Sequence, residues 1–165
     1  MAIVLTGIAV VAGAALGYVN SITAPTIEAL KVQQEKEAEQ EVLNGQEGSA
    51  IKITDPKGFG GALTVMVGLA QDGTILGYKV LESSETPGLG AKAQDWFQKG
   101  QKGDIIGKQA GKLEVSKDGG EVDAITASTI TSRAFPRCIN AAYKTLSEND
   151  AQSGASPQAK PNNNK

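Results

Sequence analysis

Five side-chain hydroxyls gather in one short segment of the chain, which reads DAITASTITSR over residues 123–133. They belong to Thr126, Ser128, Thr129, Thr131 and Ser132. An arginine ends the segment, and a pattern typical of a helix follows it. Hydroxyls, free backbone N–H groups at a helix start and a nearby cation together can bind a phosphate group. A Ser/Thr-rich helix cap has the same composition, so the residues alone leave both interpretations open.

A second specialised segment is the loop ETPGLG at residues 85–90. Its proline fixes φ, and Gly88 and Gly90 admit backbone conformations that other residues resist. The loop should therefore be rigid and expose bare backbone N–H and C=O groups, which can approach a planar ligand closely. An ordinary Pro-Gly turn explains the same residues, and the pattern alone favours that simpler interpretation.

The composition excludes several kinds of chemistry. The 165 residues carry a net charge of −2, no histidine and one cysteine, Cys138. Histidine-based catalysis, cysteine metal clusters and intrachain disulfides are thereby excluded, so we expect no catalytic residue and no metal site. Cys138 is expected to be a small buried side chain. The mildly acidic balance without a basic stripe argues against nucleic-acid binding, and any electron transfer would need an organic cofactor.

The N-terminal residues predict a membrane span. Residues 3–19 read IVLTGIAVVAGAALGYV, and the first charged side chain is Glu28. Such a stretch of about 20 residues matches the hydrocarbon thickness of a bilayer, so residues 1–26 are predicted as a transmembrane helix that Pro25 kinks or ends. The alternative is a cleaved signal peptide with a site at residues 12–14. A basic segment before the apolar run is absent, which favours the retained span.

Polar segments flank a folded region. Residues 27–49 should form a helical stalk, rich in Glu, Lys, Gln and Ala, followed by a linker from Asn44 onward. Residues 147–165 lack apolar periodicity and are predicted to be a disordered tail. The folded domain is therefore assigned to residues 50–146.

Inside that domain the pattern predicts an α+β fold. Runs 62–69 and 75–81 flank Asp72-Gly73, which indicates a β-hairpin. A short helix over 91–97, a brief strand over 112–115 and a helix over 134–146 should follow. Pro136 favours a start of this last helix nearer Pro136 than Ser132. The expected architecture is a small domain of antiparallel strands with packed helices, behind one N-terminal transmembrane helix.

Four motifs in this order resemble a known family. They are GFGG at 58–61, VGLAQDGTILG at 67–77, ETPGLG at 85–90 and KDGGEVDAITASTITSRA at 117–134. The chain is similar to the FMN-binding domain of the G subunit of the Rnf (Rsx) electron-transport complex, a relative of the C subunit of the sodium-translocating NADH:quinone oxidoreductase.

The resemblance implies a covalent FMN. In the family, its phosphate is joined to a threonine in a Ser/Thr-Gly-Ala-Thr pattern followed by x-Thr-Ser, and the pattern falls here on residues 126–132. Thr129 is then the attachment residue, and the family's Gly and Ala are Ala127 and Ser128. The other implied cofactor-binding residues are those around the attachment point and along the flavin ring: Thr126, Ser128, Thr131, Ser132, Glu85, Thr86, Gly88 and Leu89.

The resemblance also implies a role. The chain would be one redox subunit, not a catalyst alone, of a complex that exchanges electrons between ferredoxin and NAD and translocates sodium ions or protons. It would cross the inner (cytoplasmic) membrane once, with its soluble domain on the extracytoplasmic side. Its partners would be other integral membrane subunits and, for maturation, a flavin transferase that uses FAD. Open alternatives are the C subunit of the quinone reductase, a membrane-anchored binding or structural domain without flavin, and a free-standing flavoprotein reductase.

Overall fold

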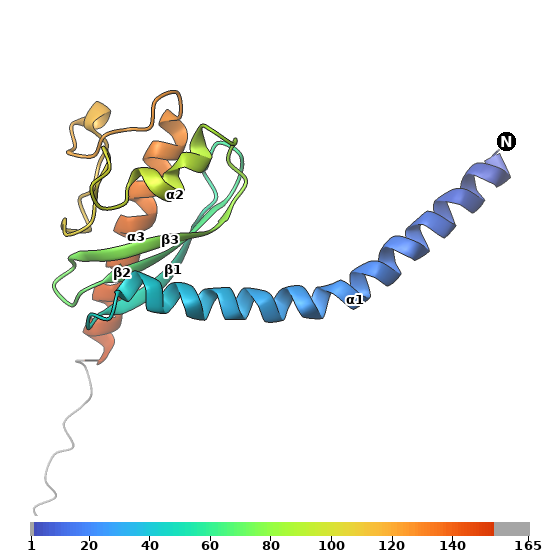
Figure 1. Ribbon diagram of the computed structural model, residues 1–165, viewed down its shortest axis with the longest axis horizontal. Coiled ribbons are helices and arrows are strands. Elements are labelled where there is room, and N and C mark those ends of the chain that lie inside the picture. Colours follow the sequence, from blue (N-terminus) through green and yellow to red (C-terminus); the bar gives the residue numbers. More distant parts are fainter. Residues whose placement is uncertain (1, 154–165) are drawn as a thin grey trace, which may run out of the picture. The chain divides into compact units, whose positions relative to one another are not determined.

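The computed structural model describes residues 2–153 of the chain. Its helices and strands are α1 (Ala2–Leu43), β1 (Ser49–Asp55), β2 (Leu63–Leu69), β3 (Ile75–Ser83), α2 (Ala93–Trp96) and α3 (Thr129–Ser153), shown in Figure 1. Two 3₁₀ turns, η1 (Gly90–Lys92) and η2 (Ser116–Asp118), lie between them. The chain divides into two units with a boundary between Glu37 and Ala38.

The first unit is the greater part of α1. By length and composition, α1 is a helix that can cross a membrane. Three of its hydroxyls are satisfied within the helix, because Thr6 donates to the carbonyl of Ala2, Ser21 to that of Tyr18 and Thr23 to that of Val19. The predicted helical stalk is confirmed, because α1 continues through Pro25 to Leu43, and Pro25 does not end the helix.

The second unit is built on a three-stranded antiparallel sheet in the order β1-β2-β3. The predicted hairpin is confirmed as β2 and β3. In the turn that joins them, Gly73 has φ +85°. Asp72 accepts hydrogen bonds there from the N–H and the hydroxyl of Thr74. Sequence reasoning missed β1, which pairs with β2 from Ser49↔Leu69 to Asp55↔Leu63. Each residue of the central strand β2 is buried.

The two faces of the sheet are covered by different helices. Val65 and Val67 of β2 belong to the main core, which includes Phe135 and Ile139 of α3. Met66, which points to the other face because side chains alternate along a strand, packs with the last turns of α1. The α+β class with packed helices is confirmed, and so is the buried position of Cys138.

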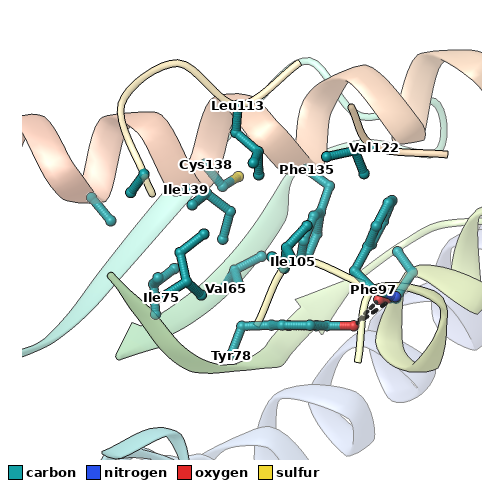
Figure 2. Packing of buried hydrophobic residues seen from close by; sticks show 14 of the residues in the cluster. Val65, Ile75, Tyr78, Phe97, Ile105, Leu113, Val122, Phe135, Cys138 and Ile139 are labelled. Carbon is teal, nitrogen blue, oxygen red and sulfur yellow. Dashed lines mark hydrogen bonds between the residues drawn. The ribbon is translucent and has the colours of Figure 1, made fainter. Parts of the chain in front are cut away.

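Three aromatic rings fix the loop region to this core (Figure 2). Phe135 stacks on Phe97 with ring centroids 4.3 Å apart and meets the edge of Tyr78 at 4.6 Å. The Tyr78 hydroxyl donates to the Ala93 carbonyl at 2.9 Å and accepts from the Phe97 N–H at 3.2 Å. Burial raises the pKa of this phenol. Because these contacts hold α2, they also hold the loop that precedes it against the sheet.

The boundaries of α3 differ from the prediction. The helix begins at Thr129, well before Pro136, and continues to Ser153 rather than ending at Leu146. Burial of Ala134 and Phe135 offsets the cost of a proline inside the helix. Residues 147–153 of the predicted tail are therefore helical, and residues 154–165 lie outside the described part of the chain.

The predicted strand over 112–115 is also wrong. It is reduced to one bridge between Val115 and Val122. Asn140 of α3 supplies the missing partners, since its Oδ1 accepts from the N–H groups of Gly111 and Leu113, both at 3.0 Å. Its Nδ2 donates to the Leu113 carbonyl at 2.9 Å. A side chain thus satisfies backbone groups that a neighbouring strand would otherwise pair.

Candidate functional site

A pocket of about 300 Å³ lies at the start of α3. Three separate loops form it, and they contain the GFGG, ETPGLG and hydroxyl-rich motifs that the sequence analysis singled out. The lining residues are Phe59, Thr86, Leu89, Gly90, Ala127, Ser128, Thr129 and Ile130. Segments far apart in the chain therefore converge on one site.

The five hydroxyls of residues 126–132 have different surroundings. Ser132 is buried; its hydroxyl accepts from the Ile125 N–H at 2.9 Å and donates to the Ser128 carbonyl at 2.7 Å. Thr131 is also buried and donates to Glu85 at 2.8 Å. Ser128 donates to the Thr131 hydroxyl at 2.9 Å. Two of the predicted residues, Thr131 and Ser132, thus lie behind the pocket wall.

Thr129 and Thr126 are the two hydroxyl residues left over. Within residues 2–153, neither side chain makes a hydrogen bond to another group of the protein. Thr129 is half-buried and lines the pocket, whereas Thr126 is exposed and is not among the lining residues. Of the five hydroxyl residues in this segment, Thr129 is therefore the one that lines the pocket with a hydroxyl available to a ligand.

The backbone at the start of α3 offers further donors. The first hydrogen bond of the helix runs from the Ser132 N–H to the Ser128 carbonyl at 3.0 Å. The N–H groups of the residues just before it, Thr129 to Thr131, precede the regular helical pairing. Together with the helix dipole they make this end of α3 favourable for negative charge.

Arg133, expected near a bound phosphate, pairs elsewhere. Its guanidinium donates twice to Asp118, at 2.7 and 2.6 Å. This contact lowers the pKa of the Asp118 carboxyl and raises that of Arg133. Both residues line a different pocket of about 220 Å³. An anion in the 300 Å³ pocket would therefore be bound by backbone N–H groups and hydroxyls rather than by Arg133.

Glu85 points into the protein rather than into the pocket. It is 7% exposed, and its Oε1 accepts from the Phe59 N–H at 2.7 Å. Its Oε2 accepts from the Thr131 hydroxyl. A Cβ on Gly90 would overlap the Glu85 carboxylate, so glycine permits this close approach.

The rest of the ETPGLG loop divides into lining and shaping residues. Thr86 and Leu89 line the pocket as predicted from the resemblance. Gly88 does not line it, and a Cβ there would meet no atom within 4 Å. Its φ of +78° shows that glycine is needed for the backbone conformation of the loop.

The predicted cofactor-binding residues did not include four lining residues: Phe59, Gly90, Ala127 and Ile130. From Ala38 to Ser153, the large hydrophobic side chains that are exposed are Phe59 (66%), Leu89 (39%) and Ile130 (48%). These three exposed side chains all line this pocket. An aromatic residue between the glycines of GFGG was the available signal for Phe59. Ala127 could have been found from the family pattern, because it has φ +61° where that pattern has glycine.

Comparison with known proteins agrees with this geometry. A family described as "FMN-binding domain" matches residues 58–144, which include the whole pocket lining. The chain is 35% identical to the G subunit of the "Ion-translocating oxidoreductase complex" of Vibrio atlanticus (strain LGP32), over 84% of this chain and 68% of that protein. A protein of the same description from Salmonella typhi is 41% identical, but the match spans only 47% of its length.

A third relative comes from Acetobacterium woodii. It is the G subunit of the "Na(+)-translocating ferredoxin:NAD(+) oxidoreductase complex", 31% identical over 90% of this chain and 92% of its own length. The match therefore extends over α1 and the pocket-bearing unit alike.

Proposed function

The chain belongs to the FMN-binding domain family, of the type found in these G subunits, and from this membership we propose that it carries FMN in the pocket at the start of α3. As such it is an electron-carrying subunit of an ion-translocating oxidoreductase complex. FMN supplies the reversible uptake and release of electrons, which this histidine-free chain with one buried cysteine does not offer by itself. The observation that carries the proposal is the Thr129 hydroxyl, unpaired within residues 2–153, in the wall of an apolar pocket.

The apolar side chains suit the ring of the flavin. Phe59, Leu89 and Ile130 expose hydrophobic surface around the pocket, and a planar aromatic ring can bury that surface. A volume of about 300 Å³ is at the lower end of the range for small-molecule sites.

Thr129 is the residue that we propose holds the phosphate. Thr131 is buried and hydrogen-bonded to Glu85, Ser128 is hydrogen-bonded to Thr131, and Thr126 lies outside the lining. In the proposed attachment, the Thr129 oxygen bonds to the phosphorus of the FMN half of FAD. The bond from that phosphorus to the AMP part breaks, AMP leaves, and the hydroxyl proton is released. No atom is oxidised or reduced, and a flavin transferase is the expected catalyst.

The start of α3 then stabilises the product. A phosphate esterified on Thr129 keeps one negative charge, and it would sit where the first N–H groups of the helix lack helical partners. The chain's own contribution is therefore to bind and orient the cofactor. The covalent bond keeps the cofactor in place between electron transfers.

The proposed setting is a membrane complex of the Rnf type. The three relatives described above are G subunits, which supports this type over the C subunit of the quinone reductase. We place α1 as a single span of the inner membrane, with the pocket-bearing unit on the extracytoplasmic side and other integral membrane subunits as partners. Ferredoxin and NAD are the expected electron donor and acceptor of the whole complex, not ligands of this chain.

The test is covalent flavin in a denaturing gel. The full-length chain, produced together with a flavin transferase, should give a fluorescent band. Thr129→Ala should abolish the fluorescence, because it removes the acceptor hydroxyl, and Thr129→Ser should keep it. Thr126→Ala is the matched control and should remain fluorescent. A fluorescent Thr129→Ala band would contradict the attachment at Thr129, and a dark wild-type band would contradict the covalent flavin.

A further inference from the structure

Two walls of the pocket meet at one buried carboxylate. Phe59, in the GFGG loop, donates its N–H to Glu85 Oε1, and Thr131, in the first turn of α3, donates its hydroxyl to Oε2. These partners are 26 and 46 residues away from Glu85 in the sequence. Glu85 itself opens the loop that forms the third wall. Its carboxylate therefore links all three loops of the site.

The carboxylate also sets the direction of a chain of hydrogen bonds. A carboxylate oxygen can only accept, so the Thr131 hydroxyl must donate to Glu85. The Thr131 oxygen is then the acceptor for the Ser128 hydroxyl at 2.9 Å. The Ser128 carbonyl in turn accepts from the hydroxyl and N–H of Ser132. Thr129 lies between these fixed residues.

Two glycines leave the space that this arrangement needs. A Cβ on Gly90 would overlap Glu85 Oε2, and one on Gly58 would lie 2.7 Å from Glu85 Oε1. Glu85 is buried, and its carboxylate accepts hydrogen bonds from Phe59 and Thr131. Its contacts run to pocket walls rather than to the core, which argues for a role in the shape of the site.

We propose that Glu85 is a positioning residue that holds the Phe59 wall and the Thr129 wall of the pocket in a fixed separation. The proposal rests on the function proposed for the pocket, but it concerns a residue that does not touch the cofactor. Phe59 would meet the flavin ring and Thr129 its phosphate, so their separation decides whether both ends fit. The carboxylate must accept two donors at once to keep that separation.

The first experiment needs no flavin. Hydrogen exchange of the full-length chain in detergent micelles, followed on a peptide that contains Phe59, reports the hydrogen bond from its N–H. Glu85→Gln offers one acceptor oxygen to two donors, so exchange at Phe59 should become about tenfold faster. Thr131→Val removes the partner of Glu85 Oε2 on α3, and with it the acceptor of the Ser128 hydroxyl, but leaves the hydrogen bond from the Phe59 N–H in place. Coupling through the carboxylate should nevertheless speed exchange at Phe59. Thr131→Ser keeps the hydroxyl and should behave as wild type.

Asp104 provides the matched control. Its two oxygens accept from the N–H groups of Gly100 and Ile106 at 2.7 and 2.8 Å, away from the pocket. Asp104→Asn therefore repeats the same chemical change and should leave exchange at Phe59 unaltered. Equal effects of Asp104→Asn and Glu85→Gln at Phe59 would overturn the proposal, because they would indicate general destabilisation.

A second readout is flavin attachment at limiting flavin transferase. The variants Glu85→Gln and Thr131→Val should load FMN several-fold more slowly than wild type. The controls Thr131→Ser and Asp104→Asn should load it at the wild-type rate. Wild-type exchange and loading in both Glu85→Gln and Thr131→Val would overturn the positioning role while leaving the proposed function intact. A wild-type chain that never takes up FMN would contradict the proposed function, and the exchange experiment would still decide the role of Glu85 in joining the walls.

Discussion

Thr129 differs from its neighbouring hydroxyl residues in what its side chain touches. Composition offers five acceptors for a phosphate within residues 126–132, and chemistry alone does not rank them. The fold distinguishes between them, because the hydroxyls of Ser128, Thr131 and Ser132 form hydrogen bonds within the protein. Thr131, the strongest competitor on sequence, is fully buried. This difference supports the choice of Thr129 independently of the family pattern.

Ala127 yields a prediction at the same scale. Its φ of +61° is unfavourable for any residue with a Cβ, at a cost of about 1–2 kcal/mol. Ala127→Gly relieves that strain but raises the conformational entropy of the unfolded chain. We therefore expect a net gain of about 0.5 kcal/mol in the free energy of unfolding. Chemical denaturation of the full-length chain measures it.

The control for this prediction is an alanine with ordinary helical geometry. Ala141 is exposed in α3, and Ala141→Gly should lower the free energy of unfolding by about 1 kcal/mol. The two substitutions should thus have opposite signs. A loss of stability in both would show that the backbone at Ala127 is not strained.

At the scale of elements, two glycines make room for the end of α1 on the sheet. Gly68 of β2 and Gly77 of β3 are paired in register, and a Cβ on either would run into the carbonyl of Val42. Val42 is buried with Ala38 and Met66 on this face. The last turn of α1 therefore lies directly on the backbone of the hairpin, which explains why glycine occupies both positions.

Gly68→Ala tests this contact. The added methyl group should displace the last turn of α1 and lower the free energy of unfolding by about 1–3 kcal/mol. Covalent FMN should remain, since the pocket is lined from the other loops. Denaturation and in-gel fluorescence of the same samples measure the two effects. Unchanged stability would refute the close packing, and loss of flavin would refute the independence of the two regions.

Patterns of adjacent residues predicted several helices and strands well. Features that depend on contacts between residues far apart in the sequence were predicted poorly. Asp72-Gly73 specified the β2–β3 hairpin because a turn depends on adjacent residues. β1 was missed because its short alternating pattern is weak by itself, and the strand is defined by its pairing with β2. Pro136 misled the prediction of the helix start, since the buried Phe135 outweighs a local preference. The contact between Glu85 and Thr131 spans 46 residues, and no pattern in the sequence indicates it.

At the scale of the whole molecule, α1 should remain attached to the unit that carries the pocket. Its residues carry no charge up to Thr26, and the helix is continuous to Leu43. We expect the mature protein to stay with the membrane fraction after an alkaline wash and to retain residues 3–19. N-terminal sequencing decides it, because a first residue near Leu16 would establish a cleaved signal peptide instead.

The most direct test of the central claim is tandem mass spectrometry of one tryptic peptide. Cleavage after Lys117 and Arg133 releases residues 118–133, which contain all five hydroxyl residues and the proposed attachment point. For wild-type protein made with a flavin transferase, the fragments should place the mass of FMN, less one water, on Thr129. The same mass on Thr131 or another hydroxyl residue, or a peptide without flavin, would contradict the account.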